Sequence, residues 1–124
     1  MDIPHRQLSV DIDRRNHLTV DLIGHVDDND IRYLDLQLIA NDELIEFEEG
    51  CTATVTYVSD DIVIARDIEC DIEDDTIIIG FDREKIENAR SGILKIQPQI
   101  TDSENRVFTL QVPIYVKVSR DIAD

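Results

Sequence analysis

Hydrophobic and polar residues alternate along most of this chain with a period of two. The segment DIECDIEDDTIIIGFD (67–82) shows the pattern most clearly, because its apolar and acidic residues take opposite parities: Ile68, Cys70 and Ile72 against Asp67, Glu69, Asp71 and Glu73. Such alternation predicts a β-strand with one apolar face and one solvated face. Asp74-Asp75 then reads as a turn into the returning strand TIIIGF. The carboxylates should therefore stand in a row on the surface and not converge on an ion or a reactive centre.

The same alternation recurs along the chain, with turn residues between the segments. It predicts strands over the following ranges: 8–12, 18–22, 34–38, 44–47, 51–57, 62–72, 76–81, 94–100 and 108–118. Short strands at regular spacing predict an all-β sandwich or barrel. Pro98 and Pro113 fall inside such runs and should lie at edges or bulges. Only FDREKIENARSG (81–92) departs from the pattern; it predicts one short helix near residues 82–91, with Asp82 as N-cap and Gly92 at its end.

The Asp60-Asp61 turn leaves two alternatives for the strands on either side of it. A regular two-residue hairpin pairs Cys51 with Cys70, which would make them neighbouring buried thiols or, as the minority case, a cross-strand disulfide. The same register places Arg66 on the inward face beside Val55, which is unfavourable for a core. A bulge near Ala65, or the end of the sheet there, would resolve this conflict and would also separate the cysteines.

Composition narrows the class of protein. A chain of 124 residues fits one domain, here expected over residues 1–120, with 121–124 as the start of a linker and the natural protein free to continue. Its 12 Lys and Arg face 28 Asp and Glu, a formal charge of −16, which argues against binding to nucleic acid or anionic membranes. The opening residues lack the apolar core of a signal peptide, and no apolar run approaches the ~20 residues of a membrane helix. We therefore expect synthesis in a cytoplasm.

Few residues occur in patterns typical of catalytic or ligand-binding groups, and we expect no catalytic, cofactor-binding or metal site. His5, His17 and His25 have no metal-ligand spacing, no serine lies in a nucleophile-elbow pattern, and the glycines are isolated. DDND at 27–30 and Asp60-Asp61 carry oxygen ligands that could form a weak calcium site. The better explanation is that Asp and Asn stabilise turns by bonding to their own backbone. Tyr33 and Tyr115 have surface parity, whereas Tyr57 has core parity.

The order and spacing of several segments resemble a known family. These segments are the G-C-x-A-x-V-x-Y strand, the D-x-x-I-x-I pair, the S-G-x-L-x-I strand and the final V-x-V-S. Over nearly the whole chain they resemble the N-terminal domain of the baseplate upper protein family, from tailed phages and prophages of Gram-positive bacteria. The resemblance implies an immunoglobulin-like antiparallel β-sandwich in the virion, at the tail baseplate, made in the host cytoplasm. No functional residue can be carried over individually, because the family acts through surfaces.

The function implied by this resemblance is structural: a protein-docking module that anchors host-recognition parts to the tail tip. Its partners would be the tail hub, receptor-binding proteins and neighbouring copies, although a charge of −16 disfavours contact between identical copies unless the contact is locally neutral or apolar. A homo-oligomer and a monomer both stay open. The alternative is an immunoglobulin-like carbohydrate- or calcium-dependent adhesion module. An acidic mimic of nucleic acid ranks third and an enzyme last.

Overall fold

The computed structural model describes residues 5–13, 18–21, 32–82, 84–85, 88–89 and 92–118, and these form an all-β fold. Ten strands make one continuous sheet, with the following bounds: β1 (His5–Asp11), β2 (Leu18–Asp21), β3 (Arg32–Ala40), β4 (Glu43–Leu44), β5 (Thr52–Ser59), β6 (Ile62–Glu73), β7 (Thr76–Phe81), β8 (Ile93–Thr101), β9 (Val107–Thr109) and β10 (Ile114–Lys117). The all-β prediction is confirmed.

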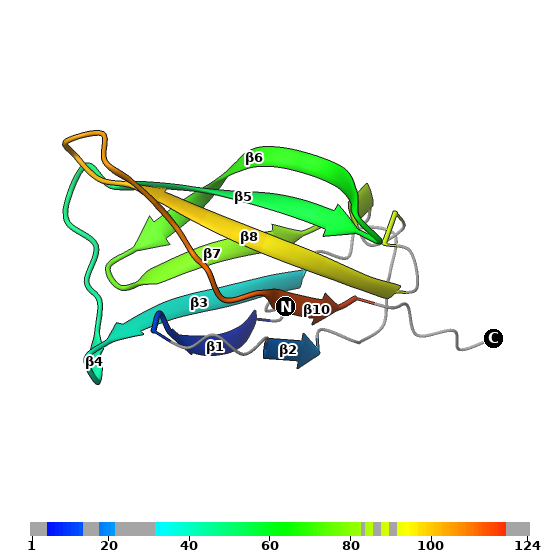
Figure 1. Ribbon diagram of the computed structural model, residues 1–124, viewed down its shortest axis with the longest axis horizontal. Coiled ribbons are helices and arrows are strands. Elements are labelled where there is room, and N and C mark those ends of the chain that lie inside the picture. Colours follow the sequence, from blue (N-terminus) through cyan, green and yellow to red (C-terminus); the bar gives the residue numbers. More distant parts are fainter. Residues whose placement is uncertain are drawn as a thin grey trace.

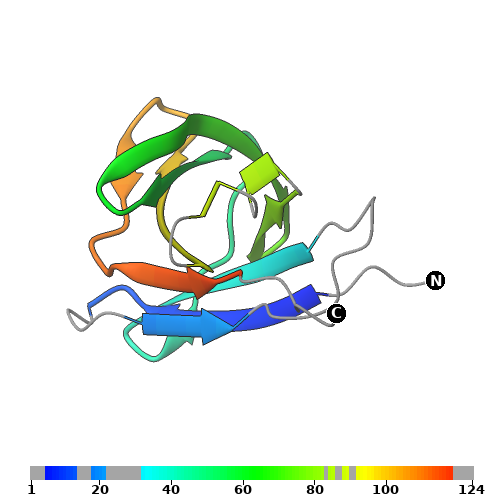
Figure 2. The same ribbon diagram turned by 90° about the vertical axis from the view of Figure 1, so that its right-hand side faces the viewer.

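The sheet curls almost into a closed barrel. Its strand order is β1-β3-β7-β6-β5-β8-β10-β2, with β4 added to β3 and β9 added to β8. The long strand β6 joins the two halves, because its first part pairs with β5 and its last residues, Asp71–Glu73, pair with β7. Figure 2 looks along the resulting ring, in which β1 and β2 lie side by side. An immunoglobulin-like sandwich stays a prediction.

The first two strands do not follow the expected antiparallel scheme. β1 pairs in parallel with β3, and β2 pairs in parallel with β10 (Figure 1). The two strands are therefore the first and the last in the strand order, and they lie near each other only because the sheet curls. Val10 lies beside Leu38, and Val20 lies beside Val116. Alternation tells which face of a strand is buried but says nothing of its neighbour. Each strand therefore buries its apolar side against a different half of the barrel.

The core is built from the inward residues of the alternating strands. β3, β5, β7 and β8 show regular alternation of buried and less buried positions. The largest fully buried side chains are Tyr57, Phe81, Leu34, Leu36, Leu38, Ile77, Ile79, Leu94, Ile96 and Ile114. Branched aliphatic side chains dominate this set, as expected for strands packed on both sides of one interior. In these four strands the core therefore confirms the parity read from the sequence.

The strand pair β5–β6 contains the bulge that Arg66 requires. Ser59 and Val58 keep the register set by the Asp60-Asp61 turn, but register shifts follow, and Ala53 then pairs with Cys70. Arg66 is exposed as a result. Both cysteines are free thiols, so the paired-cysteine register and the disulfide are wrong.

Asp67 forms the bulge. Its φ of 53° lies in the left-handed region, which Asp tolerates better than most residues. Its backbone N–H donates to the hydroxyl of Thr56 at 3.2 Å, so the group left unpaired by the bulge has a partner.

The acidic row of β6 lies on the solvated face, as its parity predicts. Its four carboxylate residues are all exposed: Asp67, Glu69, Asp71 and Glu73. The apolar residues of the other parity are less buried than expected, since Ile68 is 38% exposed and Cys70 and Ile72 are half-buried. This part of β6 therefore contributes less to the core than its parity predicts.

Half of the predicted helix, near residues 82–91, falls outside the described residues. Glu84 and Lys85 are helical, whereas residues 83, 86, 87, 90 and 91 are among those not described. Asp82 acts as the predicted N-cap, because its carboxylate accepts a hydrogen bond from the backbone N–H of Lys85 at 3.0 Å. Gly92 has a φ of 73°, which suits the expected end of the segment.

Both prolines lie where the sheet is interrupted. Pro98 sits opposite Val55 in β8, between the part of β8 that pairs with β10 and the part that pairs with β9. Pro113 directly precedes β10. Neither position requires the N–H that proline lacks.

Candidate functional site

The residues considered for catalysis or metal binding do not form a site in the described part of the chain. His17, His25 and the DDND loop at 27–30 lie outside the described residues, as does the side chain of His5. Asp60 and Asp61 have φ values of 48° and 65°, which is the geometry of a two-residue type I′ hairpin turn. Within the described ranges, no three His, Cys, Asp or Glu side chains group as metal ligands would. Nor does any described helix reach the length and apolar character needed to cross a bilayer.

A different feature lies at one end of the barrel, which we call the open end. It comprises residues 12–13, 41–51, 74–75 and 102–106, at the left of Figure 1. Two hydrogen bonds hold the irregular segment after β4 against the barrel, and a third forms a turn within the segment. Ile45 N–H donates to Leu38 O at 2.8 Å, Phe47 N–H to Asp74 O at 3.0 Å, and Cys51 N–H to Glu48 O at 3.2 Å.

The open end contains an apolar pocket of about 380 Å³. Apolar side chains from both halves of the sheet line it: Ile12, Leu38, Ile45, Phe47, Ile100 and Phe108. Glu46, Glu48, Asp102 and Arg106 form its polar rim, and Cys51 also contributes. The volume falls within the roughly 300–1,000 Å³ typical of binding pockets. This end of the core is therefore hollowed and open to solvent.

Strands β4 and β9, at the same end, carry exposed apolar side chains, of which Phe108 lines the pocket. Val107 is 59% exposed and Phe108 is 40% exposed, both on the three-residue strand β9, while Leu44 on β4 is 42% exposed. β9 pairs with β8 on one side, and no described strand pairs with it on the other. The pocket therefore adjoins an apolar sheet edge that a partner could contact.

The loop beside the pocket is organised by one carboxylate. Asp102 accepts hydrogen bonds from the backbone N–H groups of Glu104 and Arg106, each at 2.9 Å, and from Nε of Arg106 at 2.7 Å. The hydrogen bond from the Arg106 backbone is the main cause that lowers the pKa of Asp102 below its ordinary value. Asn105 adopts a φ of 64°, and the backbone of Gly50 approaches Ser103 so closely that a Cβ there would lie 3.1 Å from the Ser103 Cβ.

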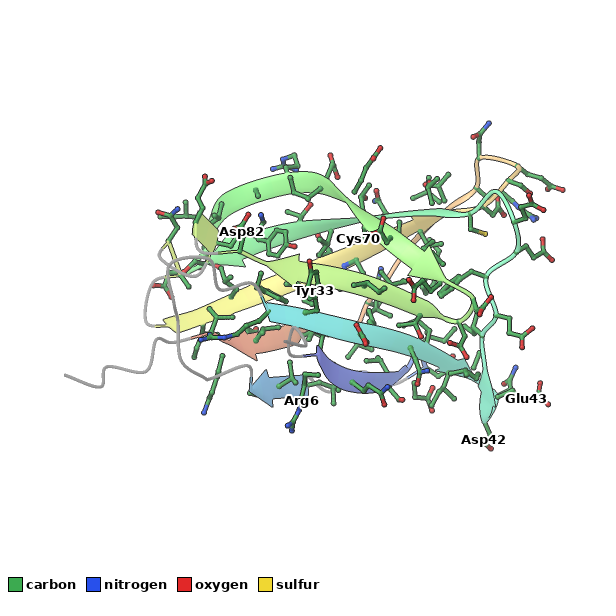
Figure 3. All side chains as sticks on the ribbon, turned by 180° about the vertical axis from the view of Figure 1, so that it is seen from behind. Arg6, Tyr33, Asp42, Glu43, Cys70 and Asp82 are labelled. Carbon is green, nitrogen blue, oxygen red and sulfur yellow. The ribbon has the colours of Figure 1, made fainter. Side chains whose placement is uncertain are left out.

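The open end is strongly acidic. Its segments contain one basic residue, Arg106, and the following acidic residues: Asp13, Asp42, Glu43, Glu46, Glu48, Glu49, Asp74, Asp75, Asp102 and Glu104. Arg106 is already engaged, since it forms ion pairs with Asp102 at 2.7 Å and with Glu104 at 3.2 Å. Figure 3 shows Asp42 and Glu43 at the tip of this end and Asp82 at the other. An apolar cavity in an anionic rim suits a cationic, partly apolar ligand.

The opposite end is closed by polar contacts. Tyr57 donates a hydrogen bond from its hydroxyl to Gly80 O at 2.6 Å, and its ring meets Phe81 edge-on. Lys85 places its ammonium 5.1 Å from the centre of the Tyr57 ring and 3.2 Å from Asp82 Oδ2. Burial, with smaller contributions from Cys70 and Asp82, raises the pKa of Tyr57 well above its ordinary value. These contacts link β5, β7 and the segment after β7 at this end of the barrel.

The surface tyrosines predicted from parity have intermediate burial. Tyr33 on β3 and Tyr115 on β10 both fall in this class, which confirms that they are not core residues. Tyr57 is buried, as its parity predicts. The alternation pattern does not predict the pocket, because it marks residues 44–47 only as a short apolar piece. The signal lay in its apolar residues Ile45 and Phe47 on an irregular segment between acidic residues.

Comparisons with known proteins complete these observations. No protein-family model matches the chain, and no curated protein matches it in sequence. The N-terminal domain of phage TP901-1 ORF48 has the same fold, with a TM-score of 0.64 and 12% sequence identity. The match covers 95% of this chain and 99% of that one. ORF48 is a baseplate upper protein, so the family resemblance read from the sequence is confirmed at the level of the fold.

Proposed function

We propose that this domain is a structural component of a phage tail baseplate. The observation that carries the proposal is the fold match to the N-terminal domain of phage TP901-1 ORF48, which extends over nearly all of both chains. The order of the sequence motifs and the backbone fold both support this proposal. The proposed location is accordingly the virion, at the tail tip, after synthesis in the host cytoplasm.

Within the baseplate, the domain would act as a protein-docking module that anchors host-recognition parts. An apolar pocket next to an unpaired strand edge supports this role, since such features are typical of protein-binding surfaces. The proposed partners are the tail hub and receptor-binding proteins. We propose no catalytic activity. The nearly closed sheet would then be a variant of the immunoglobulin-like sandwich, with β6 passing between its two layers.

Co-expression with tail proteins tests this function. The tagged domain is produced together with a tail hub protein from the same phage or prophage, and the complex is isolated by affinity and sized by chromatography with light scattering. We expect a stable complex of fixed stoichiometry with the hub or with another baseplate protein. A domain that associates with no tail protein, in this assay or in purified tail particles, would contradict the proposal.

A further inference from the structure

The pocket at the open end offers a specific mode of docking. We propose that it receives an apolar side chain from a partner protein, carried on an extended segment that has lysine or arginine residues on either side. This inference rests on the proposed docking function and names the kind of segment that docks and the place where it docks.

The side chains that line the pocket are mostly apolar and therefore favour an apolar side chain from the partner. Ile45, Phe47 and Phe108 surround a space of about 380 Å³ that is open to solvent. Filling it with an aliphatic or aromatic side chain would remove apolar surface of both partners from water, which favours binding. Phe108 lines the pocket and is also 40% exposed to solvent, so a bound side chain could cover it further. Among the apolar side chains that line the pocket, Phe108 is the most exposed.

The rim of the pocket is acidic and therefore favours a partner segment that carries lysine or arginine. Glu46 and Glu48 stand on the pocket rim, and Arg106, the sole base in the segments of the open end, is paired with Asp102 and Glu104. A second copy of the chain would bring another formal charge of −16 to this end and be repelled. A segment with lysine or arginine on both sides of the inserted residue would instead complement the rim.

The geometry leaves room for such a segment. β9 lies beside the pocket with one edge unpaired among the described strands, so an extended segment can run along it. β10 ends at the other end of the barrel, where Val118 N–H donates to Gly92 O at 2.9 Å. A partner seated in the pocket would therefore lie away from the end of β10.

A peptide titration tests the binding mode directly. The ¹⁵N-labelled domain is titrated with the acetylated, amidated peptide GKKLKKG, and with GKKSKKG and GEELEEG as matched controls. We expect amide shifts for the leucine–lysine peptide to concentrate at residues 45–48 and 106–108. Affinity should be at least about tenfold weaker for each control, and should fall between about 50 mM and about 0.5 M salt. Shifts spread over the acidic face of β6, equal binding of the serine peptide, or no binding would overturn the proposal.

Matched variants separate the pocket from general surface effects. Phe108→Ser removes a 40% exposed apolar side chain at the pocket, and Ile62→Ser removes a 47% exposed one at the other end. Glu48→Lys and Glu69→Lys make the same charge change at the rim and on β6. We expect Phe108→Ser and Glu48→Lys to weaken peptide binding about tenfold or more and the controls to change it less than twofold. Phe108→Leu, which keeps the apolar surface, should bind within about threefold of wild type, and a melting curve confirms that each variant is folded.

The same variants in the hub co-expression assay separate the two proposals. If the wild-type domain binds a tail protein and Phe108→Ser and Glu48→Lys do not, both proposals are supported. If these two variants bind as well as wild type, the pocket inference is wrong and the docking function stands. If wild type binds no tail protein, the proposed function fails, and the peptide titration still decides the pocket inference.

Discussion

The hydroxyl of Tyr57 donates a 2.6 Å hydrogen bond to the carbonyl oxygen of Gly80, which joins β5 to β7 across the barrel. β7 pairs with β6 only from Thr76 to Ile78, so Gly80 lies beyond the last bonded pair of these strands. The bond therefore ties the sheet together where the bulged part of β6 leaves β7. The Phe81 ring, with its centroid 5.5 Å from that of Tyr57, holds the phenol in place.

Removing this hydroxyl should destabilise the domain. Tyr57→Phe deletes the donor and leaves the Gly80 carbonyl without that partner, at a cost of about 1–2 kcal/mol in free energy of unfolding. Tyr57→Leu also loses the edge-on contact with Phe81 and should cost more, about 3 kcal/mol. Urea denaturation followed by circular dichroism measures both. A Phe variant as stable as wild type would show that the bond contributes nothing to closure.

The Asp82–Lys85 contact should stabilise the same end. Asp82 caps the backbone N–H of Lys85 and pairs with its ammonium, so Asp82→Ala should cost about 1 kcal/mol. Asp82→Asn, which keeps a cap acceptor but not the ion pair, should cost less. Denaturation curves of the two variants at neutral pH give the order, and an Asn variant less stable than Ala would contradict it.

Acid should also act on this contact. Burial tends to raise the pKa of Asp82, but hydrogen bonds from the backbone and ammonium of Lys85 outweigh it, and the pKa lies below its ordinary value of 3.8. A depressed carboxyl pKa stabilises the folded state at neutral pH, and this contribution is lost as the pH falls below about 4. Asp82→Ala should therefore lose less stability on acidification than wild type. Parallel acid profiles for the two proteins would argue against the assignment.

The β6 bulge depends on Thr56 and Asp67. Thr56→Val removes the acceptor for the Asp67 N–H and should cost about 1 kcal/mol, whereas Thr56→Ser keeps it and should cost less. Asp67→Ala should cost about 1 kcal/mol because Ala disfavours a φ of 53°, whereas Asp67→Gly should be neutral or stabilising. Chemical denaturation of the four variants tests both pairs. If Gly is as unfavourable as Ala, backbone geometry is not what selects Asp67.

Cys70 should behave as an unreactive thiol. Burial is the main cause that raises its pKa from 9.0 to about 11; the charge of Asp71 adds to this, and Lys85 opposes it. In a Cys51→Ser background, only about one thiol in a thousand is ionised at pH 8, so alkylation by iodoacetamide should be slow and rise about tenfold per pH unit. Mass spectrometry gives the rates. A rate that levels off near pH 9 would contradict the raised pKa.

Sequence reasoning predicted the faces of the strands better than their neighbours. Alternation placed Leu34 and Ile96 inside and Glu69 outside, because period-two geometry is local. The same pattern could not show that β1 and β2 pair in parallel with β3 and β10, since partner choice depends on contacts far along the chain. The misplaced Arg66 did reveal the bulge, because a charged side chain on an inward parity conflicts with burial.

The open-end pocket could not be predicted for a related reason. Ile12, Ile45 and Ile100 come from three distant segments and meet only after the sheet has curled. Phe47 lies on an irregular segment whose position is set by a hydrogen bond to Asp74 in another turn. Apolar residues of this kind read as core positions in a sequence, and only the folded chain shows that they line an opening.

Direct localisation in tail particles tests the central claim, that this domain is a baseplate component. Purified tails from the phage or prophage that encodes the chain are treated with a lysine- and carboxylate-reactive cross-linker and analysed by mass spectrometry, together with electron microscopy of antibody-labelled particles. We predict cross-links from this domain to tail hub or receptor-binding proteins and label at the tail tip. Intact tails that carry the hub but contain no peptide of this domain would contradict the account.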